Sequence, residues 1–386
     1  MKKLLFASNL FPDRAEPYRG LDNATLLHHL RGEFEVRVLA PRPAPPFLGK
    51  GKRVCREEDR PFEPRYPTAR YVPKFGSAFN HRLMAAALRG PMRELRQNFA
   101  FELVLASWIY PDGCAVARLA AEMDFPFVLI TQGSDVHQYL KNRLRKKAIL
   151  DAAGNAAAVI TRSGELARLL AEAGVARAKL HPIYNGVDFA TFSPAPRENA
   201  RRELDIPQDA RVLLFVGNFY AVKNPQLLLR AHADLCRAEA DTRCELFLLG
   251  GGPLEQELRA RAQELGFARH VHFAGRKSAP EVARFMQAAD ALCVPSENEG
   301  VPNVILEAFA TGLRVVASDV GGIPEVLQTK FLGRTFERGN LPELVFALAE
   351  ILAGAPDREA ICAHARQFSW PRAAAGYAKI LHEAAP

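Results

Sequence analysis

The sequence predicts an α/β protein with two Rossmann-like domains, each built on a doubly wound parallel sheet. Short runs of Val, Leu, Ile and Phe alternate with helical patterns, and this alternation occurs in two series along the chain. Near-continuous apolar runs are typical of strands that helices cover on both faces. At 386 residues the chain is also too long for one compact core. We therefore expect two domains of ordinary size.

The expected strands form one series in each half of the chain. In the first half the apolar runs predict strands at residues 3–8, 34–39, 103–106, 127–131 and 157–161. In the second half they predict strands at residues 211–216, 245–249, 271–273, 291–294 and 314–317. Helical periodicity between the strands of the second half predicts helices at residues 224–240, 253–265 and 279–288.

A break between the two series falls near residues 185–201. Asn185, Gly186, Val187 and Asp188 supply turn chemistry, and two prolines stiffen the linker that follows. We expect a first domain over residues 1–190 and a second over residues 195–367. A final helix at residues 370–385 is expected to return to the first domain, which would then include residues 370–386.

The charge of the chain is concentrated in its first half. Residues 1–190 hold 29 Lys and Arg against 19 Asp and Glu, a net charge of +10, whereas residues 191–386 hold 22 against 24, a net of −2. A solvated basic surface explains this balance, and so does a face that meets an anionic membrane or an anionic acceptor. Nucleic acid is disfavoured as a partner because the basic residues are not interleaved with exposed aromatic residues.

Targeting and redox signals both favour a cytoplasmic protein. The apolar stretch after Lys3 ends at Pro12, which is short for a secretory segment, and no apolar run is long enough to span a membrane. The six cysteines are scattered without a C-x-x-C pair or histidines at the usual metal spacing. This spacing predicts reduced thiols rather than a disulfide framework or a zinc site.

Three stretches of the first half are candidates for contact with an acceptor or a membrane. Residues 41–74 are rich in Pro, Arg and Lys and are too long for a simple connection, so we expect either an acceptor-handling loop or a disordered insertion. Residues 81–96 form an amphipathic basic helix, and residues 141–147 hold five basic side chains. Both segments suit an interfacial helix and equally an ordinary surface helix.

The residues with the most specific chemistry lie between Pro295 and Ala308. This stretch follows a buried strand and opens a helix, whose first backbone N–H groups form a natural phosphate site. Glu299 lies in the loop and Glu307 about two helical turns further on. Two carboxylates at this spacing suit two parts of one extended ligand, because carboxylate oxygens accept hydrogen bonds from sugar hydroxyls. For an isolated pair at this spacing, the better explanation is a loop acid at Glu299 and a capping or solvated helix residue at Glu307.

The surrounding motifs resemble the donor-binding signature of retaining glycosyltransferases of family 4. The matching residues are Glu299-x₇-Glu307, Ala308 to Gly312 and Val315 to Glu325, together with Asn185 to Asp188, Gly250 to Pro253, Phe273 to Gly275 and Phe368 to Trp370. The resemblance covers essentially the whole chain and implies the GT-B fold, with a donor cleft between the domains. Phe11-Pro12, Arg19-Gly20 and Tyr110 to Gly113 are most similar to the branch that makes cell-surface polysaccharides, such as the teichuronic acid transferases.

The resemblance implies a role for each matching residue. Glu307 would bind the donor ribose, Glu299 a hydroxyl of the transferred sugar, and Lys223 the diphosphate. The backbone of Gly300, Val301 and Asn303 would meet the remaining hydroxyls and the phosphate. Arg276 would flank the base, and Gly20 would let its loop approach the phosphate closely.

The sequence departs from the family at two positions. Asn218 stands where many relatives carry an arginine, so Lys223 and the helix terminus must carry more of the phosphate charge. Gln132 stands where many relatives carry a histidine, and an amide holds a hydroxyl but transfers no proton. Asp135 and His137 are the nearby alternatives for such a role.

The implied reaction is retaining hexosyl transfer from a UDP- or GDP-sugar to a saccharide or lipid-linked saccharide. The resemblance implies no cofactor and no metal, and no D-x-D motif is present. We expect front-face attack, with Lys223 and the helix near Asn303 stabilising the departing diphosphate.

Two rival functions are weighed against this one. In a nucleotide-cofactor oxidoreductase Gly250 to Gly252 would begin G-x-G-x-x-G, but Glu255 occupies the third glycine position. The other rival is a catalytically weak or inactive nucleotide-sugar-binding protein of the same fold, which the departures at Asn218 and Gln132 favour.

Overall fold

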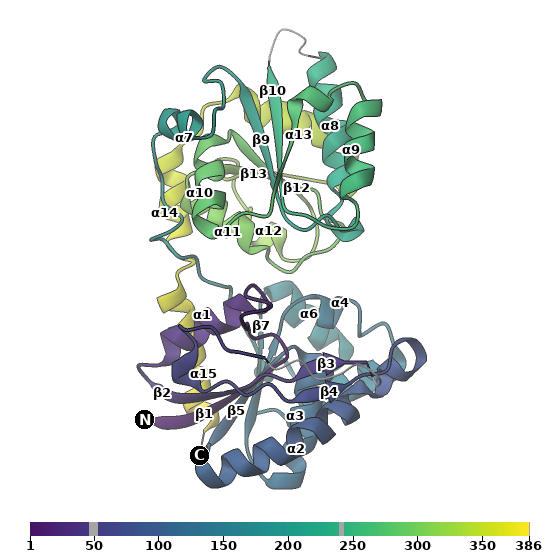
Figure 1. Ribbon diagram of the computed structural model, residues 1–386, viewed down its shortest axis with the longest axis vertical. Helices are drawn as coiled ribbons and strands as arrows, with labels where there is room; N and C mark the ends of the chain where they lie inside the picture. Colours follow the sequence, from purple (N-terminus) through teal and green to yellow (C-terminus); the bar gives the residue numbers. More distant parts are fainter. Residues whose placement is uncertain (46–52, 239–242, 386) are drawn as a thin grey trace. The chain divides into compact units, whose positions relative to one another are not determined.

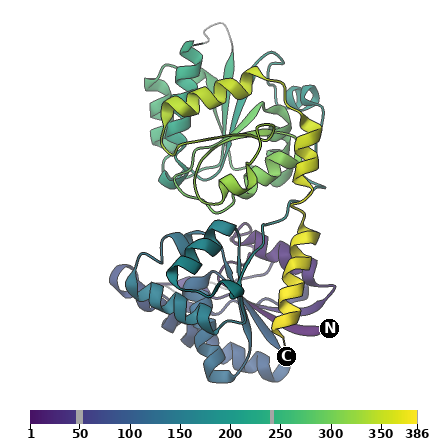
Figure 2. The same cartoon turned by 180° about the vertical axis from the view of Figure 1, so that it is seen from behind.

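The computed structural model of the protein divides into two compact units and describes residues 1–45, 53–238 and 243–385. Unit 1 comprises Met1–Asn185 together with Trp370–Pro386, and unit 2 comprises Gly186–Ser369. Within each unit a central sheet is covered by helices on both faces (Figures 1 and 2). The predicted α/β class with two doubly wound parallel sheets is confirmed.

The sheet of unit 1 has six strands, which pair in parallel in the order β2-β1-β5-β6-β7-β8. The strands are β1 (Lys2–Ala7), β2 (Phe34–Leu39), β5 (Leu103–Ser107), β6 (Phe127–Thr131), β7 (Ala158–Thr161) and β8 (Leu180–Pro182). The helices are α1 (Leu21–Leu30), α2 (Asn80–Asn98), α3 (Cys114–Met123), α4 (Ser134–His137), α5 (Arg143–Asn155), α6 (Gly164–Ala173) and α15 (Trp370–Ala384).

Alternate residues of β1 show why this sheet is covered twice. Leu4 and Phe6 belong to a core cluster with α1 and α15, whereas Leu5 and Ala7 belong to a second cluster with α2, α3 and α5. All four side chains are buried. A strand with both faces buried reads as a continuous apolar run, which is why it could be found in the sequence.

The sheet of unit 2 also has six parallel strands, in the order β11-β10-β9-β12-β13-β14. The strands are β9 (Arg211–Val216), β10 (Cys244–Leu249), β11 (Val271–Gly275), β12 (Ala291–Val294), β13 (Arg314–Ser318) and β14 (Gly333–Phe336). The helices are α7 (Arg197–Glu203), α8 (Pro225–Ala238), α9 (Glu255–Glu264), α10 (Ala279–Ala288), α11 (Asn303–Ala310), α12 (Ile323–Val326), α13 (Leu341–Ala353) and α14 (Arg358–Ala365).

The change from one unit to the other falls slightly earlier than the sequence indicated. Residues 186–190, expected in the first domain, belong to unit 2. The physical reason is a short backbone pairing, in which the Val187 N–H donates to the Phe368 carbonyl at 2.8 Å and Val187 bridges Ser369. The outgoing and returning chain segments therefore both leave unit 2 at this pairing, and α15 lies in unit 1.

The long irregular stretch at residues 41–74 contains structure that the sequence did not indicate. Its ends form a two-stranded parallel ribbon of β3 (Arg42–Ala44) and β4 (Thr68–Arg70). Residues 46–52 lie outside the described part of the chain, and part of the expected loop falls there. The ribbon fixes Arg42 and its neighbours next to the loop that follows β1.

Candidate functional site

The strand order of unit 2 identifies the place where a ligand is expected. Numbered along the chain, its six strands run 3-2-1-4-5-6, so the order reverses between β9 and β12. In open parallel sheets ligands bind at such a switch point, outside the carboxyl ends of the two strands. The loop after β9 carries Lys223, and the loop after β12 carries Glu299.

Lys223 and Glu299 contact each other as an ion pair. The hydroxyl of Ser296 donates a hydrogen bond of 2.8 Å to Glu299 Oε1, which is also the oxygen that the Lys223 ammonium group contacts. The Lys223 side chain is 30% exposed and that of Glu299 is 12% exposed. The structure thus brings together the residues predicted for the diphosphate and for the sugar.

The loop that carries Glu299 is fixed against the loop that carries Lys223. The backbone N–H of Glu297 donates to the carbonyl of Val222 at 2.8 Å. The amide group of Asn224 donates to the Glu297 carboxylate at 2.6 Å. These bonds tie the two loops to each other, and such preorganisation is what electrostatic catalysis requires.

A glycine pair after β13 supports Glu299 from the other side. Gly321 has a φ of +56°, and a Cβ atom built there would lie 1.7 Å from the carbonyl oxygen of Glu299. The N–H of Gly322 donates to the carbonyl of Gly300 at 2.9 Å. Only glycine fits this close approach of two backbones. Gly300 therefore lies in a loop held on two sides.

Helix α11 begins directly after this loop. Pro302 is its N-cap residue, and the proline side chain has no group that can cap the first turn. Val301 and Asn303 are half-buried at this helix start. Glu307, one helical turn beyond Asn303, is also half-buried, while the neighbouring Leu306 packs in the core. The arrangement matches the expected anion site at a helix N-terminus with a carboxylate further along.

Asn218 and Arg276 are exposed residues that follow β9 and β11, the strands on either side of β10. The glycine-rich turn after β10 packs closely against the loop after β9. A Cβ atom built at Gly250 would lie 1.8 Å from the carbonyl oxygen of Gly217. A Cβ at Gly251 would lie 3.7 Å from Nε of Arg276. The Gly-rich turn is thus explained by packing of neighbouring loops, and Arg276 lies beside it.

In unit 1 the loop after β1 ends at Gly20, the N-cap residue of α1. Gly20 has a φ of +61°, and a Cβ there would lie 2.3 Å from the carbonyl carbon and oxygen of Leu10. Glycine is therefore required at position 20 because any side chain would collide with the backbone of Leu10. The Gly20 carbonyl accepts from the N–H of Asn23, the first of several polar residues at this edge.

Gln132 joins the ends of three strands of unit 1. Its side-chain amide donates to the Ser107 hydroxyl at 2.7 Å and to Oδ1 of Asn23 at 3.1 Å. Asn23 belongs to the helix after β1, and Ser107 is the last residue of β5. Gln132 thus holds neighbouring groups in place, in agreement with the absence of acid–base chemistry in its amide.

Asp135 organises the loop after β6. It is fully buried, and its carboxylate accepts the backbone N–H groups of Ile109 at 2.9 Å, Gln132 at 2.9 Å and Gly133 at 2.8 Å. Burial raises the pKa of this carboxyl group against these hydrogen bonds. The structure therefore gives Asp135 a supporting role in place of the direct substrate contact predicted. His137, the other alternative, lies 3.4 Å from the Glu165 carboxylate.

Asp112 is a buried acid at the switch point of unit 1, where β1 and β5 are neighbours. Oδ2 of Asp112 accepts the backbone N–H of Asn9 at 2.8 Å and the Asn9 side-chain amide at 2.5 Å. Burial raises the pKa of Asp112 to about 7, although hydrogen bonds from Asn9 and Ser8 act in the opposite direction. Arg19 in turn donates to the Asn9 carbonyl at 2.8 Å.

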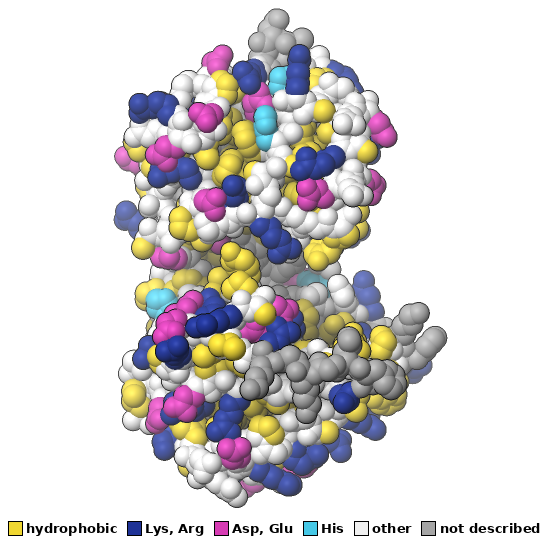
Figure 3. All heavy atoms as spheres, in the orientation of Figure 1, with side chains coloured by type: hydrophobic (Ala, Val, Ile, Leu, Met, Phe, Trp, Pro, Cys, Tyr) yellow, Lys and Arg dark blue, Asp and Glu magenta, His cyan; other side chains and the backbone are white. Residues whose placement is uncertain are grey.

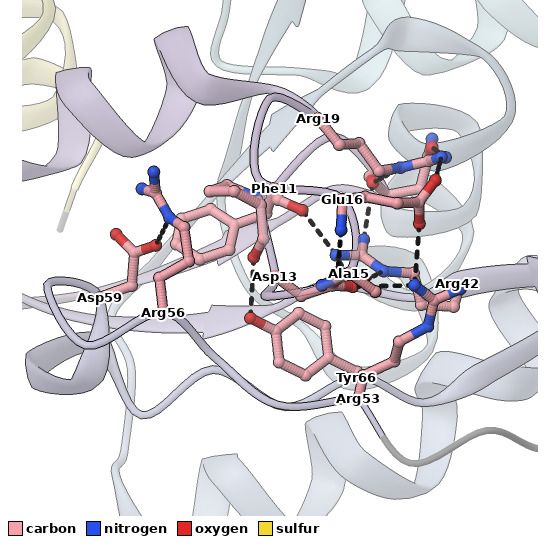
Figure 4. A network of polar contacts seen from close by, with 12 residues as sticks. Phe11, Asp13, Ala15, Glu16, Arg19, Arg42, Arg53, Arg56, Asp59 and Tyr66 are labelled. Atoms are coloured by element: carbon pink, nitrogen blue, oxygen red, sulfur yellow. Dashed lines mark hydrogen bonds and ion pairs between the residues drawn. The ribbon is translucent and has the colours of Figure 1, made fainter. Parts of the chain in front are cut away.

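A second polar network connects the loop after β1 to Arg42 and Tyr66 (Figure 4). Arg42 Nε donates to Asp13 Oδ2 at 3.0 Å, and the other guanidinium nitrogens donate to the carbonyls of Asn9 at 2.9 Å and Phe11 at 2.6 Å. Tyr66 donates to the carbonyl of Pro12 at 2.9 Å. The loop that ends at Gly20 is thus fixed by residues of the stretch 41–74.

Asn23 and Ser107 were missed by sequence reasoning, and Ser296, Gly321 and Asp112 lay within the motifs already described, without a role of their own. All five lie on a buried strand end or within the loop or helix that follows one, and this position is the signal that could have identified their roles. What was missing was the strand order, which decides which strand ends are neighbours.

Comparisons with known proteins show which families the two halves of the chain resemble. Residues 196–368 match the glycosyl transferases group 1, and residues 23–191 match glycosyltransferase family 4. The two matches extend over most of the two units. Each half of the chain therefore matches a glycosyltransferase family. The Glu299-x₇-Glu307 stretch lies in the segment that matches group 1.

Individual relatives match this chain over part of their length. It is 37% identical over 206 residues to a D-inositol 3-phosphate glycosyltransferase of Actinosynnema mirum, covering 50% of this chain and 49% of the relative. It is 36% identical over 211 residues to that of Thermobispora bispora, covering 52% and 49%. The chain spans about half the length of these relatives.

Solved structures resemble this chain over almost its full length. Sucrose-phosphate synthase from Thermosynechococcus elongatus has a TM-score of 0.78 at 20% identity, covering 99% of both chains. Anabaena HepE in complex with UDP has a TM-score of 0.77 at 18% identity, covering 99% of this chain and 100% of HepE. These similarities establish the GT-B fold.

Proposed function

We propose that this protein transfers a hexosyl group, with retention of anomeric configuration, from a UDP- or GDP-sugar to a saccharide or lipid-linked saccharide. The observation that carries the proposal is the contact of Lys223 with Glu299 at the switch point of unit 2, next to the start of α11. A diphosphate joined to a sugar suits this edge of the sheet, because a cation, a carboxylate and a helix N-terminus lie there together.

In the proposed complex each donor group has its own partner. Lys223 and the amides at the start of α11 hold the diphosphate, Glu299 accepts from a sugar hydroxyl, and Glu307 accepts from the ribose. Because Lys223 carries three N–H donors, it can keep its contact with Glu299 while it binds a phosphate oxygen. Anabaena HepE, which has the same fold, has been solved in complex with UDP-glucose, so a uridine donor is the first one to test.

The proposed chemistry needs no metal ion and no cofactor. The leaving diphosphate gains negative charge as its bond to the anomeric carbon breaks, and Lys223 and the helix terminus are already placed to meet that charge. In front-face attack the departing phosphate oxygen takes the acceptor proton. The sugar then keeps its configuration, so an inverted product would contradict this mechanism.

Unit 1 is assigned to the acceptor. Its basic face at α2 and α5 exposes Phe79 and Leu144, 45% and 55% exposed, close to a cavity of about 370 Å³ that is also lined by Arg82, Arg118 and Lys147. Lys and Arg side chains gather over α2 in Figure 3. Apolar side chains among cations suit an anionic membrane or a lipid-linked acceptor.

We extend the proposal to the cell context. The similarity of the loops at residues 11–20 and 110–113 to cell-surface polysaccharide transferases supports synthesis of such a polysaccharide. A cytoplasmic location with peripheral contact at the inner membrane face fits that role. None of the described helices combines the length and the apolar composition that crossing a bilayer requires.

A second candidate is a nucleotide-sugar-binding protein with little or no turnover. Asn218 is exposed and neutral where many relatives carry arginine, and the Gln132 amide is engaged by Ser107 and Asn23. At both positions this chain lacks a charged or titratable side chain that many relatives carry. The residues proposed to contact the donor, Lys223, Glu299 and Glu307, are all present.

A panel of UDP- and GDP-sugars distinguishes the two functions. We expect one donor to raise the melting temperature of the purified full chain and to be consumed, by transfer or slow hydrolysis, with release of the nucleoside diphosphate. Stabilisation without any consumption, with membrane extract supplied as acceptor, would favour the binding protein. If no nucleotide sugar or free nucleotide raises the melting temperature, the proposed donor site is wrong.

A further inference from the structure

Unit 2 contains a cluster of three side chains that the proposed reaction does not use. His232 and Cys236 lie on α8, and Cys244 is the first residue of β10. The ligand atoms of the three side chains all lie within 4.8 Å of one another. His232 and Cys244 are buried, at 0% and 6% exposure, whereas Cys236 is half-buried. Two sulfur atoms and one imidazole therefore meet at one partly accessible point.

Local structure explains why the three side chains converge. His232 and Cys236 are four positions apart, so they lie on the same face of α8. That face packs on the sheet, in a core cluster that includes Leu235 and Cys244. Cys244 begins a strand whose register with β9 pairs it with Arg211. The cluster is thus fixed by one helix and one strand of regular structure.

The distances agree with the dimensions of a tetrahedral metal site. With zinc bonds of about 2.3 Å to sulfur and 2.0–2.1 Å to nitrogen, the ligand atoms of a tetrahedron are about 3.6 Å apart for S–N and about 3.8 Å apart for S–S. The Cys236 Sγ to His232 Nε2 distance is 3.5 Å. The upper limit of 4.8 Å for the remaining pairs leaves only small adjustments.

Hydrogen bonding alone does not account for the buried histidine. Nε2 of His232 lies 2.9 Å from the carbonyl oxygen of Cys244, whereas Nδ1 is buried with no hydrogen-bond partner among the described residues. A neutral imidazole that donates through Nε2 leaves Nδ1 as an unsatisfied acceptor. A fully buried ring with one unsatisfied nitrogen beside two thiols is an expensive arrangement if packing is its only role.

We propose that His232, Cys236 and Cys244 bind one thiophilic divalent ion, with zinc as the best fit. Two thiolates and one imidazole nitrogen are ligands that zinc prefers, and the partial exposure of Cys236 leaves a fourth position for water. Binding requires both thiols to lose their protons and the His232 ring to present the lone pair of one nitrogen to the ion. Binding through Nδ1 keeps the hydrogen bond from Nε2 to the Cys244 carbonyl, and binding through Nε2 replaces that hydrogen bond.

The ion would act as a clamp between α8 and the sheet, separate from the donor site. Cys244 starts β10 and Leu249 ends it, so Cys244 lies about 17 Å along the strand from Leu249, after which the loop at Gly250 begins. The proposal is therefore independent of metal-free sugar transfer. It departs from the prediction of reduced thiols without a zinc site, which rested on the usual motifs, because H-x₃-C followed by x₇-C is not one of them.

Cobalt titration of the full chain tests the proposal. The protein is reduced with a phosphine, stripped with a chelator, and titrated with Co²⁺ at micromolar concentration. We expect a thiolate-to-cobalt absorption band that saturates at one ion per chain and disappears when one equivalent of Zn²⁺ is added. Absence of a saturating band from the reduced protein would overturn the site.

Four variants identify the ligands. Cys236→Ser and Cys244→Ser should abolish the band, and His232→Gln should weaken binding at least about tenfold. Cys362→Ser, which changes a cysteine of α14 in the same unit, is the matched control and should bind as the parent does. Because Cys236 is partly exposed, Cys236→Ser should keep the parent's circular dichroism spectrum. An unchanged band in that variant, or its loss in Cys362→Ser, would contradict the assignment.

Discussion

The ammonium group of Lys223 contacts the carboxylate of Glu299 although the two residues are 76 positions apart in the chain. Each residue lies on the loop after its own strand, and the contact exists because β9 and β12 are neighbours at the point where the strand order reverses. In the proposed complex this contact and the bonds between the two loops hold the cation in place, so little reorganisation is needed when the leaving group becomes charged.

Replacement of Lys223 by methionine should affect the reaction more than donor binding. Methionine keeps much of the length of the side chain but removes the charge that stabilises the departing diphosphate. Loss of one such preorganised group lowers kcat by about 10²- to 10³-fold. The measurement is the steady-state rate of nucleotide release with the donor found in the panel. Arg230→Ala, which removes a cation from an exposed position of α8, is the control; a Lys223→Met rate equal to the control's would contradict the role.

Replacement of Glu307 by alanine should weaken donor binding. The lost hydrogen bonds to ribose hydroxyls correspond to about 1–3 kcal/mol, or roughly 5- to 150-fold in Kd. Calorimetry with the free nucleoside diphosphate measures this directly, because the ribose is present and the sugar is not. Glu264→Ala, at the exposed end of α9, should bind as the parent does. If Glu307→Ala and parent have the same Kd, the ribose contact is excluded.

Replacement of Gly321 by alanine should displace the loop that carries Glu299. The new Cβ would lie 1.7 Å from the Glu299 carbonyl oxygen, so one of the two backbones must move. Gly266→Ala is a matched control, because Gly266 has a φ of +83° but no atom within 4 Å of the built Cβ. Gly266→Ala therefore introduces only the strain of an alanine in a left-handed backbone conformation, which costs about 1–2 kcal/mol of stability.

The comparison of these two alanine variants separates strain from displacement. We expect both to lose stability in thermal melts, and only Gly321→Ala to lose donor binding and turnover at a temperature where both are folded. Equal activity of the two variants would show that the close approach of Gly321 does not set the position of Glu299.

The strands that sequence reasoning found carry either an apolar run or a regular alternation of apolar residues. β2, β6, β9 and β12 were predicted with the bounds observed. β6 and β12 are buried along their whole length, whereas β2 alternates apolar and charged residues. β8 and β14 were missed because each is short, with Pro182 ending the first and half-exposed Arg334 and Thr335 within the second. These two strands lack the apolar signal on which the prediction rested.

The site was predictable in its chemistry but not in its contacts. The motif around Glu299 and the position of Lys223 after a strand were readable from the sequence. That these two residues meet depends on the order of strands in the sheet, which no local pattern encodes. The same limit explains why Asp112 was not linked to Asn9, and why Asp135 was taken for a ligand contact although three backbone N–H groups occupy it.

The basic face of unit 1 predicts binding to anionic vesicles. A Phe79→Ser and Leu144→Ser double variant removes two exposed apolar side chains without changing charge, and should lower co-sedimentation with phosphatidylglycerol vesicles several-fold. High salt should lower it too, since screening weakens attraction between exposed charges. The matched control is Val222→Ser and Phe346→Ser, two exposed apolar residues of unit 2, 41% and 59% exposed. Equal sedimentation of both double variants would exclude α2 and α5 as the docking face.

The buried carboxyl group of Asp112 predicts how stability depends on pH. Burial raises its pKa in the folded chain to about 7, from an ordinary value of 3.8. Between these two values the folded chain holds a proton that the unfolded chain has lost, so the free energy of unfolding falls as pH rises through this window. The full difference is on the order of 4 kcal/mol. Above pH 7 the loss is complete.

Asp112→Asn isolates this effect, because asparagine keeps the shape and an acceptor oxygen for the Asn9 N–H but does not titrate. The melting temperature of the variant should fall less than that of the parent between pH 5 and pH 8, so the two curves converge or cross as pH rises. Asp234→Asn, a change at the surface of α8, should follow the parent in parallel. Parallel curves for Asp112→Asn and the parent would show that Asp112 is ionised throughout, and that the hydrogen bonds from Asn9 and Ser8 outweigh the cost of its burial.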